Sequence, residues 1–312
     1  MEIAVGTFEA VALMLVIGVV GFWIISRRVL PTQALGILSP LALEVALPCL
    51  VFANIVQQFD PATRPRWWAM PLYWAAFTVG AILLSRAGAL LADRRTRREF
   101  RLSLLYQNAI FFPLVILTEL YGAESDYVTD LFLFTLFFPP FIFITYRRFL
   151  GRRVKIEDWR KIVHPVLIAV ALGLAVRGTG LHAAVPEFAV NALARVGAMS
   201  APILMLILGG NIYVDFKRRG DVRFGEIVKF VAVKNVAFPL IAIGVIALLR
   251  PPTELAMLLL LQSASPPITS VPILIGREGG DAAIASQLLL GSFLAAVVSI
   301  PLMMYLLTRF VV

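Results

Sequence analysis

Two stretches of this chain place amide, hydroxyl and proline residues inside otherwise apolar segments, where they could bind a polar solute. The segment 254–276 is long and apolar enough to cross a bilayer, yet residues 262–267 at its centre read QSASPP. Proline lacks an N–H donor and clashes with the carbonyl four residues earlier, so the helix is predicted to open and free the carbonyls of Gln262 and Ser263. Such carbonyls are tolerated at membrane depth only where protein packs on them or a water-filled cavity receives them. This stretch is therefore a candidate binding site.

A second stretch has the same character, because residues 106–113 read YQNAIFFP. Pro113 should free the carbonyl of Ala109 beside Asn108, so we expect this helix to be interrupted too and the two interruptions to meet at the bilayer centre. Amides, hydroxyls and the partly positive N-termini of broken helices suit an anionic or polar solute. The competing interpretation is that these side chains only pair helix to helix. The candidate substrate-binding residues are Gln107, Asn108, Pro113, Gln262, Ser263, Ser265, Pro266, Pro267 and Thr269.

Three further polar residues inside apolar segments are candidates for ion coupling. Glu44 lies four residues before Pro48 on the same helix face, and Lys234 and Asn235 precede Pro239 in a later segment. An ionisable group within the membrane is a functional hypothesis by default. Glu44 could instead pair with a nearby cation or face the cytoplasmic interface, and Lys234 could extend to the cytoplasmic surface. The sequence leaves both interpretations open.

The motifs of common enzymes and of nucleotide-binding proteins do not occur. The sequence has no HExxH, GxxxxGK[ST] or GxGxxG pattern, and His164 and His182 lack Cys or carboxylate neighbours at metal-ligand spacing. We therefore expect no enzyme activity, no catalytic residue, no metal site and no bound cofactor. Active transport would then depend on an ion gradient, with H⁺ or Na⁺ as the coupling ion, or on the gradient of the solute itself.

Composition places the chain in a membrane. Of its 312 residues, 60% are hydrophobic and only 15% are charged, with a mean hydropathy of +0.88, whereas soluble domains carry about 25% charged residues. The net charge of +9 fits basic cytoplasmic loops, so we expect the lipid bilayer and no nucleic acid as a partner. The single cysteine, Cys49, excludes an internal disulfide. The N-terminal segment has no basic region or cleavage site, so we interpret it as a retained span.

Hydropathy and charge together predict the number of spans and their orientation. Loops after odd-numbered spans hold most of the Lys and Arg residues, so the positive-inside rule places both termini on the outer side of the cell (inner) membrane. The opposite side holds only Arg64, Arg66, Arg177, Arg250 and Arg309. The predicted spans, 1 to 10, are Phe8–Ile25, Gly36–Gln58, Trp67–Ala92, Phe100–Tyr121, Val128–Tyr146, His164–Val176, Phe188–Tyr213, Glu226–Leu249, Glu254–Gly276 and Ala282–Thr308.

The two halves of the sequence match at an offset of 154 or 155 residues, which indicates an internal duplication. Pro48 matches Pro202, and Gln107 matches Gln262. Five spans per repeat is an odd number, so the second copy should be inverted in the membrane. We predict an all-α integral membrane protein with ten transmembrane helices, in which broken helices 4 and 9 cross. The inverted repeats would be residues 1–155 (spans 1–5) and 156–312 (spans 6–10).

Four motifs together resemble the auxin efflux carrier family, whose bacterial members have ten spans. They are LALEVALPCLVFANI in span 2, YQNAIFFPLVI in span 4, MSAPILMLILGGNIY in span 7 and SASPPITSVPILIGREGGDAAIASQLLLGSFLAAVVSIPL across spans 9 and 10. The resemblance covers nearly the whole chain. Asn108 and Pro113 match the crossover Asn and proline of span 4, and Pro266 or Pro267 matches the span 9 counterpart.

The resemblance implies the fold shared with bile acid sodium symporters and transport by an elevator movement. Spans 3–5 and 8–10 would form a mobile transport domain, whereas spans 1, 2, 6 and 7, with Glu44, would form a scaffold that usually dimerises. Family substrates are organic anions, including auxin in plants and malonate or similar carboxylates in bacteria. Two departures stand out. Ala109 to Phe112 replace the usual glycines of span 4, which predicts a more apolar pocket, and span 3 lacks the acidic residue of plant members.

We therefore predict a secondary carrier for a small organic anion of the carboxylate class, bound where spans 4 and 9 cross, in a homodimer formed through the scaffold. The alternatives are a sodium-coupled symporter of a larger amphipathic acid and a channel-like passive pore. A membrane-embedded enzyme would need a buried nucleophile with its base or a metal cluster, and the sequence indicates neither.

Overall fold

The computed structural model describes residues 2–60, 64, 66–123, 125–151, 164–218 and 221–311, and these residues are predominantly helical. The predicted repeat boundary at residues 155/156 lies outside them. The first half contains α1 (Glu2–Ser26), α2 (Ala34–Pro40), η1 (Leu41–Ala46), α3 (Leu47–Gln58), η2 (Trp67–Ala69), α4 (Met70–Gly88), η3 (Ala89–Leu91), α5 (Arg97–Leu105), α6 (Phe111–Tyr121), α7 (Asp126–Phe134) and α8 (Phe138–Phe149). The second half contains α10 (Pro165–Gly178), η4 (Leu181–Ala184), α11 (Glu187–Ala198), α12 (Ser200–Arg218), α13 (Phe224–Val231), η5 (Ala232–Ala237), α14 (Phe238–Leu249), α15 (Thr253–Ala264), α16 (Ser270–Arg277) and α17 (Ala282–Phe310).

Several helical stretches are long and apolar enough to cross a membrane, as a multi-pass membrane protein requires. Within the described residues they are Val5–Ser26, Ala34–Gln58, Trp67–Leu91, Asp126–Phe149, Glu187–Val214, Phe224–Leu249 and Ala282–Phe310. The other three predicted spans, 4, 6 and 9, contain the shorter apolar helices α6, α10 and α15. Spans 4 and 9 are each divided, into α5 and α6 and into α15 and α16.

Two other predicted spans are also divided near prolines. Span 5 separates into α7 and α8 after Thr135, because Pro139 and Pro140 cannot donate to the carbonyls four residues earlier. Span 7 separates into α11 and α12 at Met199, upstream of Pro202. The predicted bounds of these spans did not show the divisions, since hydropathy averages over an interruption that a single missing N–H produces.

Two other prolines are accommodated by π-helical turns instead of breaks. The turn η1 ends just before Pro48 and carries Glu44, and η5 ends just before Pro239 and carries Lys234 and Asn235. A π-helical turn adds one residue to the helical repeat, which relieves the clash between a proline ring and the preceding turn. Such turns occur frequently at functional sites, and these two carry the three residues that the sequence marked for ion coupling.

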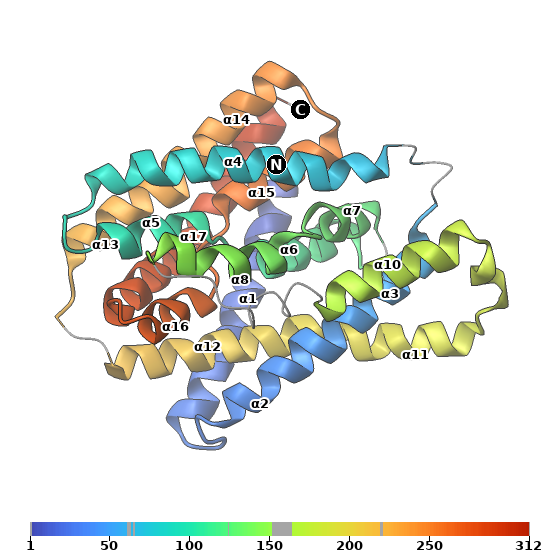
Figure 1. The fold of residues 1–312 in the computed structure, drawn as a ribbon, viewed down its shortest axis with the longest axis horizontal. Coiled ribbons are helices and arrows are strands. Elements are labelled where there is room, and N and C mark those ends of the chain that lie inside the picture. The colour runs from blue at the N-terminus through green and yellow to red at the C-terminus, as the bar shows by residue number, and fades with distance from the viewer. Residues whose placement is uncertain are drawn as a thin grey trace.

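The helices α1 and α12 cross with their backbones in direct contact. A Cβ atom added at Gly209 would lie 1.7 Å from the carbonyl oxygen of Gly18, and one added at Gly21 would lie 2.2 Å from that of Leu206. Small residues permit this approach between membrane helices. Next to this pair, α3 packs against α10 and α11, and these three lie at one end of the molecule while α13 and α16 lie at the other (Figure 1).

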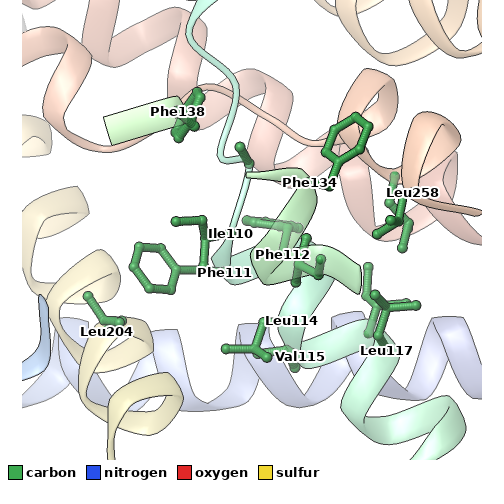
Figure 2. Packing of buried hydrophobic residues seen from close by; sticks show 14 of the residues in the cluster. Ile110, Phe111, Phe112, Leu114, Val115, Leu117, Phe134, Phe138, Leu204 and Leu258 are labelled. Carbon is green, nitrogen blue, oxygen red and sulfur yellow. The ribbon is translucent and has the colours of Figure 1, made fainter. Parts of the chain in front are cut away.

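The buried core gathers around the start of α6. Figure 2 shows Ile110 and Phe111 on the side that carries Leu204 of α12, whereas Leu117 lies on the side of Leu258 from α15. All five side chains are buried. The first turns of α6 are thus enclosed by apolar residues from two other helices, which places the interruption of span 4 deep inside the protein.

Candidate functional site

The interruptions of spans 4 and 9 lie against each other as a short antiparallel pair. The backbone N–H of Asn108 donates to the carbonyl of Pro266 at 2.7 Å, and the N–H of Ile268 donates to the carbonyl of Tyr106 at 2.9 Å. The sequence prediction that these two stretches meet is confirmed by the two hydrogen bonds. We call this region the crossing, defined as residues 106–113 and 262–269.

The carbonyl that Pro113 frees in span 4 finds its donor in span 9. Gln262 Nε2 donates to the carbonyl oxygen of Ala109 at 2.6 Å, and Gln262 Oε1 accepts from Gln107 Nε2 at 3.3 Å. Gln107 and Gln262 are 4% and 0% exposed. Unpaired polar groups are costly away from water. Gln262 therefore stabilises this region by giving a hydrogen-bond partner to two buried groups, the carbonyl of Ala109 and the amide of Gln107.

The carbonyl of Ser263, which Pro267 frees, accepts a hydrogen bond from a lysine. Lys234 Nζ donates to this oxygen at 3.0 Å and lies 5.3 Å from the centre of the Phe238 ring. Lys234 is 1% exposed, so the interpretation in which it extends to the cytoplasmic surface was wrong. The freed carbonyl and the ring offer the ammonium two favourable contacts inside the protein. The Lys234 amine therefore lies directly beside the crossing.

The remaining predicted ligands have mainly local partners. Asn108 Oδ1 accepts from the N–H of Phe111 at 3.1 Å and so caps the start of α6. The hydroxyls of Ser263 and Ser265 each donate to a carbonyl of their own helix. Thr269, at the N-cap position of α16, is half-buried and makes no side-chain capping bond. The crossing thus brings the predicted amides together, while the serines turn back to α15.

Both helices that begin at the crossing keep unpartnered backbone donors. Within the described residues, the N–H groups of Ala109 and Ile110 at the start of α6 reach no protein acceptor, and neither do those of Thr269 and Ser270 at the start of α16. Helix N-termini carry partial positive charge and favour anions. Two such termini therefore give the crossing a partly positive electrostatic character, and the Lys234 side chain adds a further N–H donor beside it.

The other two residues marked for ion coupling occupy different positions. Asn235 is buried and ties η5 to α17, since its Nδ2 donates to the carbonyl of Ser292 at 3.0 Å and its Oδ1 accepts from the Ser292 hydroxyl at 2.7 Å. Glu44 is exposed on η1 and lies near enough to act electrostatically on His164. The structure therefore places Lys234 beside the crossing, Asn235 against α17 and Glu44 on the exposed side of η1.

A cavity of about 350 Å³ lies between α3, α11 and α12 on one side and α6 and α7 on the other. It reaches α6 one to two turns beyond the helix start. The Ser200 hydroxyl is buried and has no hydrogen-bond partner among the described residues. The polar residues of the lining are Asn54, Gln57, Thr118, Arg195 and Ser200.

Arg195 was missed by the analysis of the sequence. It lies inside the predicted span 7, where a charge is by itself a signal of function, but it was treated as part of an apolar stretch. In the structure its side chain is exposed at the cavity, and the described residues offer it no ion-pair partner. Among the described residues, no group of three or more His, Cys, Asp or Glu could hold a metal ion.

These features define a class of protein: a multi-pass helical membrane protein in which two interrupted helices cross inside the fold, an arrangement found in secondary transporters. A family model described as "Membrane transport protein" matches residues 7–155 and 149–304, nearly the whole chain. The chain therefore belongs to this family, the auxin efflux carrier family, and is a membrane transporter. A comparison with curated proteins finds no match.

Proposed function

We propose that this transporter is a secondary carrier of a small organic anion of the carboxylate class, which binds at the crossing. The observation that supports this most directly is the pair of helix N-termini with unpartnered N–H groups beside the buried Lys234 side chain. A carboxylate has two oxygens that accept from N–H donors, and the positive end of each helix dipole offsets its charge. A neutral solute would gain much less from the same groups.

The amides and prolines of the crossing have complementary roles in this proposal. Pro113, Pro266 and Pro267 keep the backbone open, because they remove the donors that would continue each helix. Gln107 and Gln262 hold the two openings together, and Asn108 fixes the start of α6. Ser263, Ser265 and Thr269 would contact the solute near the start of α16.

The cavity between α3, α11 and α12 and the α6–α7 pair provides an approach for the anion. Arg195 and the unpartnered Ser200 hydroxyl line it, and an exposed arginine raises the local concentration of anions. It follows the boundary between the scaffold helices of spans 1, 2, 6 and 7 and the transport helices of spans 3–5 and 8–10. An elevator movement would slide α6 and α7 along this boundary. We further propose H⁺ or Na⁺ as the coupling ion, a homodimer through the scaffold, and the cell (inner) membrane with both termini outside.

The test is transport by the Asn108→Ala variant in proteoliposomes, with a panel of labelled small carboxylates. We expect saturable uptake to fall at least about tenfold, while membrane abundance and elution volume stay unchanged, because an N-cap contributes only about 0.5–2 kcal/mol to folding. Asn211→Ala on α12 is the matched control and should transport like the natural chain.

Full uptake by Asn108→Ala would refute the assignment of the site. Conductance without saturation or exchange in the natural chain would instead indicate a passive pore. Uptake that requires sodium and accepts only larger amphipathic acids would favour a sodium-coupled symporter.

A further inference from the structure

A second positively charged site lies away from the crossing, where α4 ends and α5 begins. A cavity of about 320 Å³ is lined by Arg86, Arg94, Arg97, Arg98 and Arg101, with Ala89, Leu102 and Phe149 as its apolar wall. These residues come from α4, α5, α8 and the turn between α4 and α5, which are all elements outside the predicted scaffold (Figure 1). The cavity is therefore not part of the boundary along which the transported anion is proposed to move.

Among the described residues, four of the five arginines of this cavity have no counter-charge. The Nε atoms of Arg97 and Arg101 are buried and have no hydrogen-bond partner among the described residues. Arg97 and Arg101 are four residues apart and so lie on one face of α5, where like charges destabilise a helix. Arg101 places its guanidinium 5.1 Å from the centre of the Phe149 ring, and Arg98 donates to the carbonyl of Leu150 at 3.5 Å.

Three of the nearby carboxylates pair with other residues, and Glu99 lies close to Arg98 alone among the arginines of the cavity. Asp93 and Glu226 both pair with Lys229, at 3.1 and 2.7 Å. Glu278 pairs with Arg147 at 3.0 Å. Glu99 Oε1 accepts from the backbone N–H of Asp281 at 3.2 Å and lies 3.9 Å from Arg98 Nε, which is a long ion pair. Within the described part of the chain, four of the arginines thus have no ion-pair partner at all.

We propose that this cavity binds a phosphate group, presented by an anionic phospholipid of the adjoining leaflet. Several guanidinium forks around one small space can donate bidentately to the two non-bridging oxygens of a phosphodiester. The cavity lies at the end of the membrane-spanning stretch Trp67–Leu91, and Leu90 and Leu91 beside it are 69% and 59% exposed. Basic pockets between helices at the membrane surface bind phosphorylated headgroups, and these leucines would contact the acyl chains.

The test measures the thermal unfolding of the purified full chain in neutral detergent, titrated with phosphatidylglycerol or with phosphatidylcholine. We expect phosphatidylglycerol to raise the unfolding temperature in a saturable way and phosphatidylcholine to have no such effect, because a ligand that binds only the folded state stabilises it by mass action. The Arg97→Gln/Arg101→Gln variant should need about tenfold or more phosphatidylglycerol for the same shift.

Arg27→Gln/Arg223→Gln is the matched control, since it removes the same charge from exposed arginines that do not line the cavity. It should keep the natural response. Equal loss in both double variants, or no loss in either, overturns the proposal in favour of general attraction between the basic chain and anionic lipid.

Two further arms refine the outcome. The Arg97→Lys/Arg101→Lys variant keeps the charge but loses the planar forks, so it should also bind more weakly, and it replaces the glutamine variant if that one does not fold. If the lysine variant binds phosphatidylglycerol as tightly as the natural chain does, the proposed role of the guanidinium geometry is refuted. Titration with inorganic phosphate and glycerol 3-phosphate distinguishes the sources: saturation by the free anions at the lipid's concentration supports the phosphate site but assigns it to a soluble ligand.

Discussion

Removing Gln262 should destabilise the fold more than removing its partner Gln107, although both lose the hydrogen bond that they share. Gln262→Ala leaves two buried groups alone: the Gln107 amide and the Ala109 carbonyl, which Pro113 has already deprived of its helical donor. Gln107→Ala leaves Gln262 still bonded to Ala109 at 2.6 Å and removes only the longer bond of 3.3 Å.

The magnitudes follow from these contacts. A buried polar group left without a partner costs about 1–3 kcal/mol, whereas side-chain pairs between membrane helices average about 0.6 kcal/mol. We therefore expect a loss of unfolding free energy of about 2–3 kcal/mol for Gln262→Ala and about 1 kcal/mol for Gln107→Ala. A double-mutant cycle should give a coupling of about 0.5–1 kcal/mol.

The assay is reversible unfolding of the purified variants in mixed micelles, with uptake measured on the same preparations. Gln57→Ala is the control, because Gln57 Nε2 donates to Asn191 Oδ1 at 3.0 Å in an exposed pair, and its loss should cost less than about 0.5 kcal/mol. The reasoning fails if Gln107→Ala costs as much as Gln262→Ala, or if Gln262→Ala is no more damaging than Gln57→Ala.

Two other variants test separate parts of the structure. Lys234→Met should abolish most uptake but change the unfolding free energy by less than about 2 kcal/mol, because it removes the buried amine together with the Ser263 hydrogen bond. Unchanged uptake would exclude Lys234 from the site. Gly209→Ala should lose about 3 kcal/mol or more, since its Cβ would overlap the α1 backbone. Gly244→Ala, where a Cβ meets nothing within 4 Å, should be neutral, and equal thermal stability of the two alanine variants would contradict the close contact.

Local chemistry explains which parts of the fold could be predicted. The sequence identified the interruptions of spans 4 and 9, because a proline removes one known donor and frees one known carbonyl whatever surrounds it. The same reasoning applied to Pro139 and Pro140 would have found the division between α7 and α8. Arg195 was equally visible as a charge inside a predicted span, but only the structure shows that it faces a cavity.

The sequence by itself thus determined that this is a membrane protein, where its helices weaken and which carbonyls lose their donors. Only the tertiary structure decided which groups replace those donors. Gln262 reaches Ala109 across 153 residues, and Lys234 reaches Ser263 across 29. Hydrogen bonds between such distant positions depend on how the helices pack, and a helix buried among apolar neighbours accepts whichever donor the packing brings within reach. For the same reason, only the structure could show that Lys234 reaches the crossing and does not extend to the cytoplasmic surface.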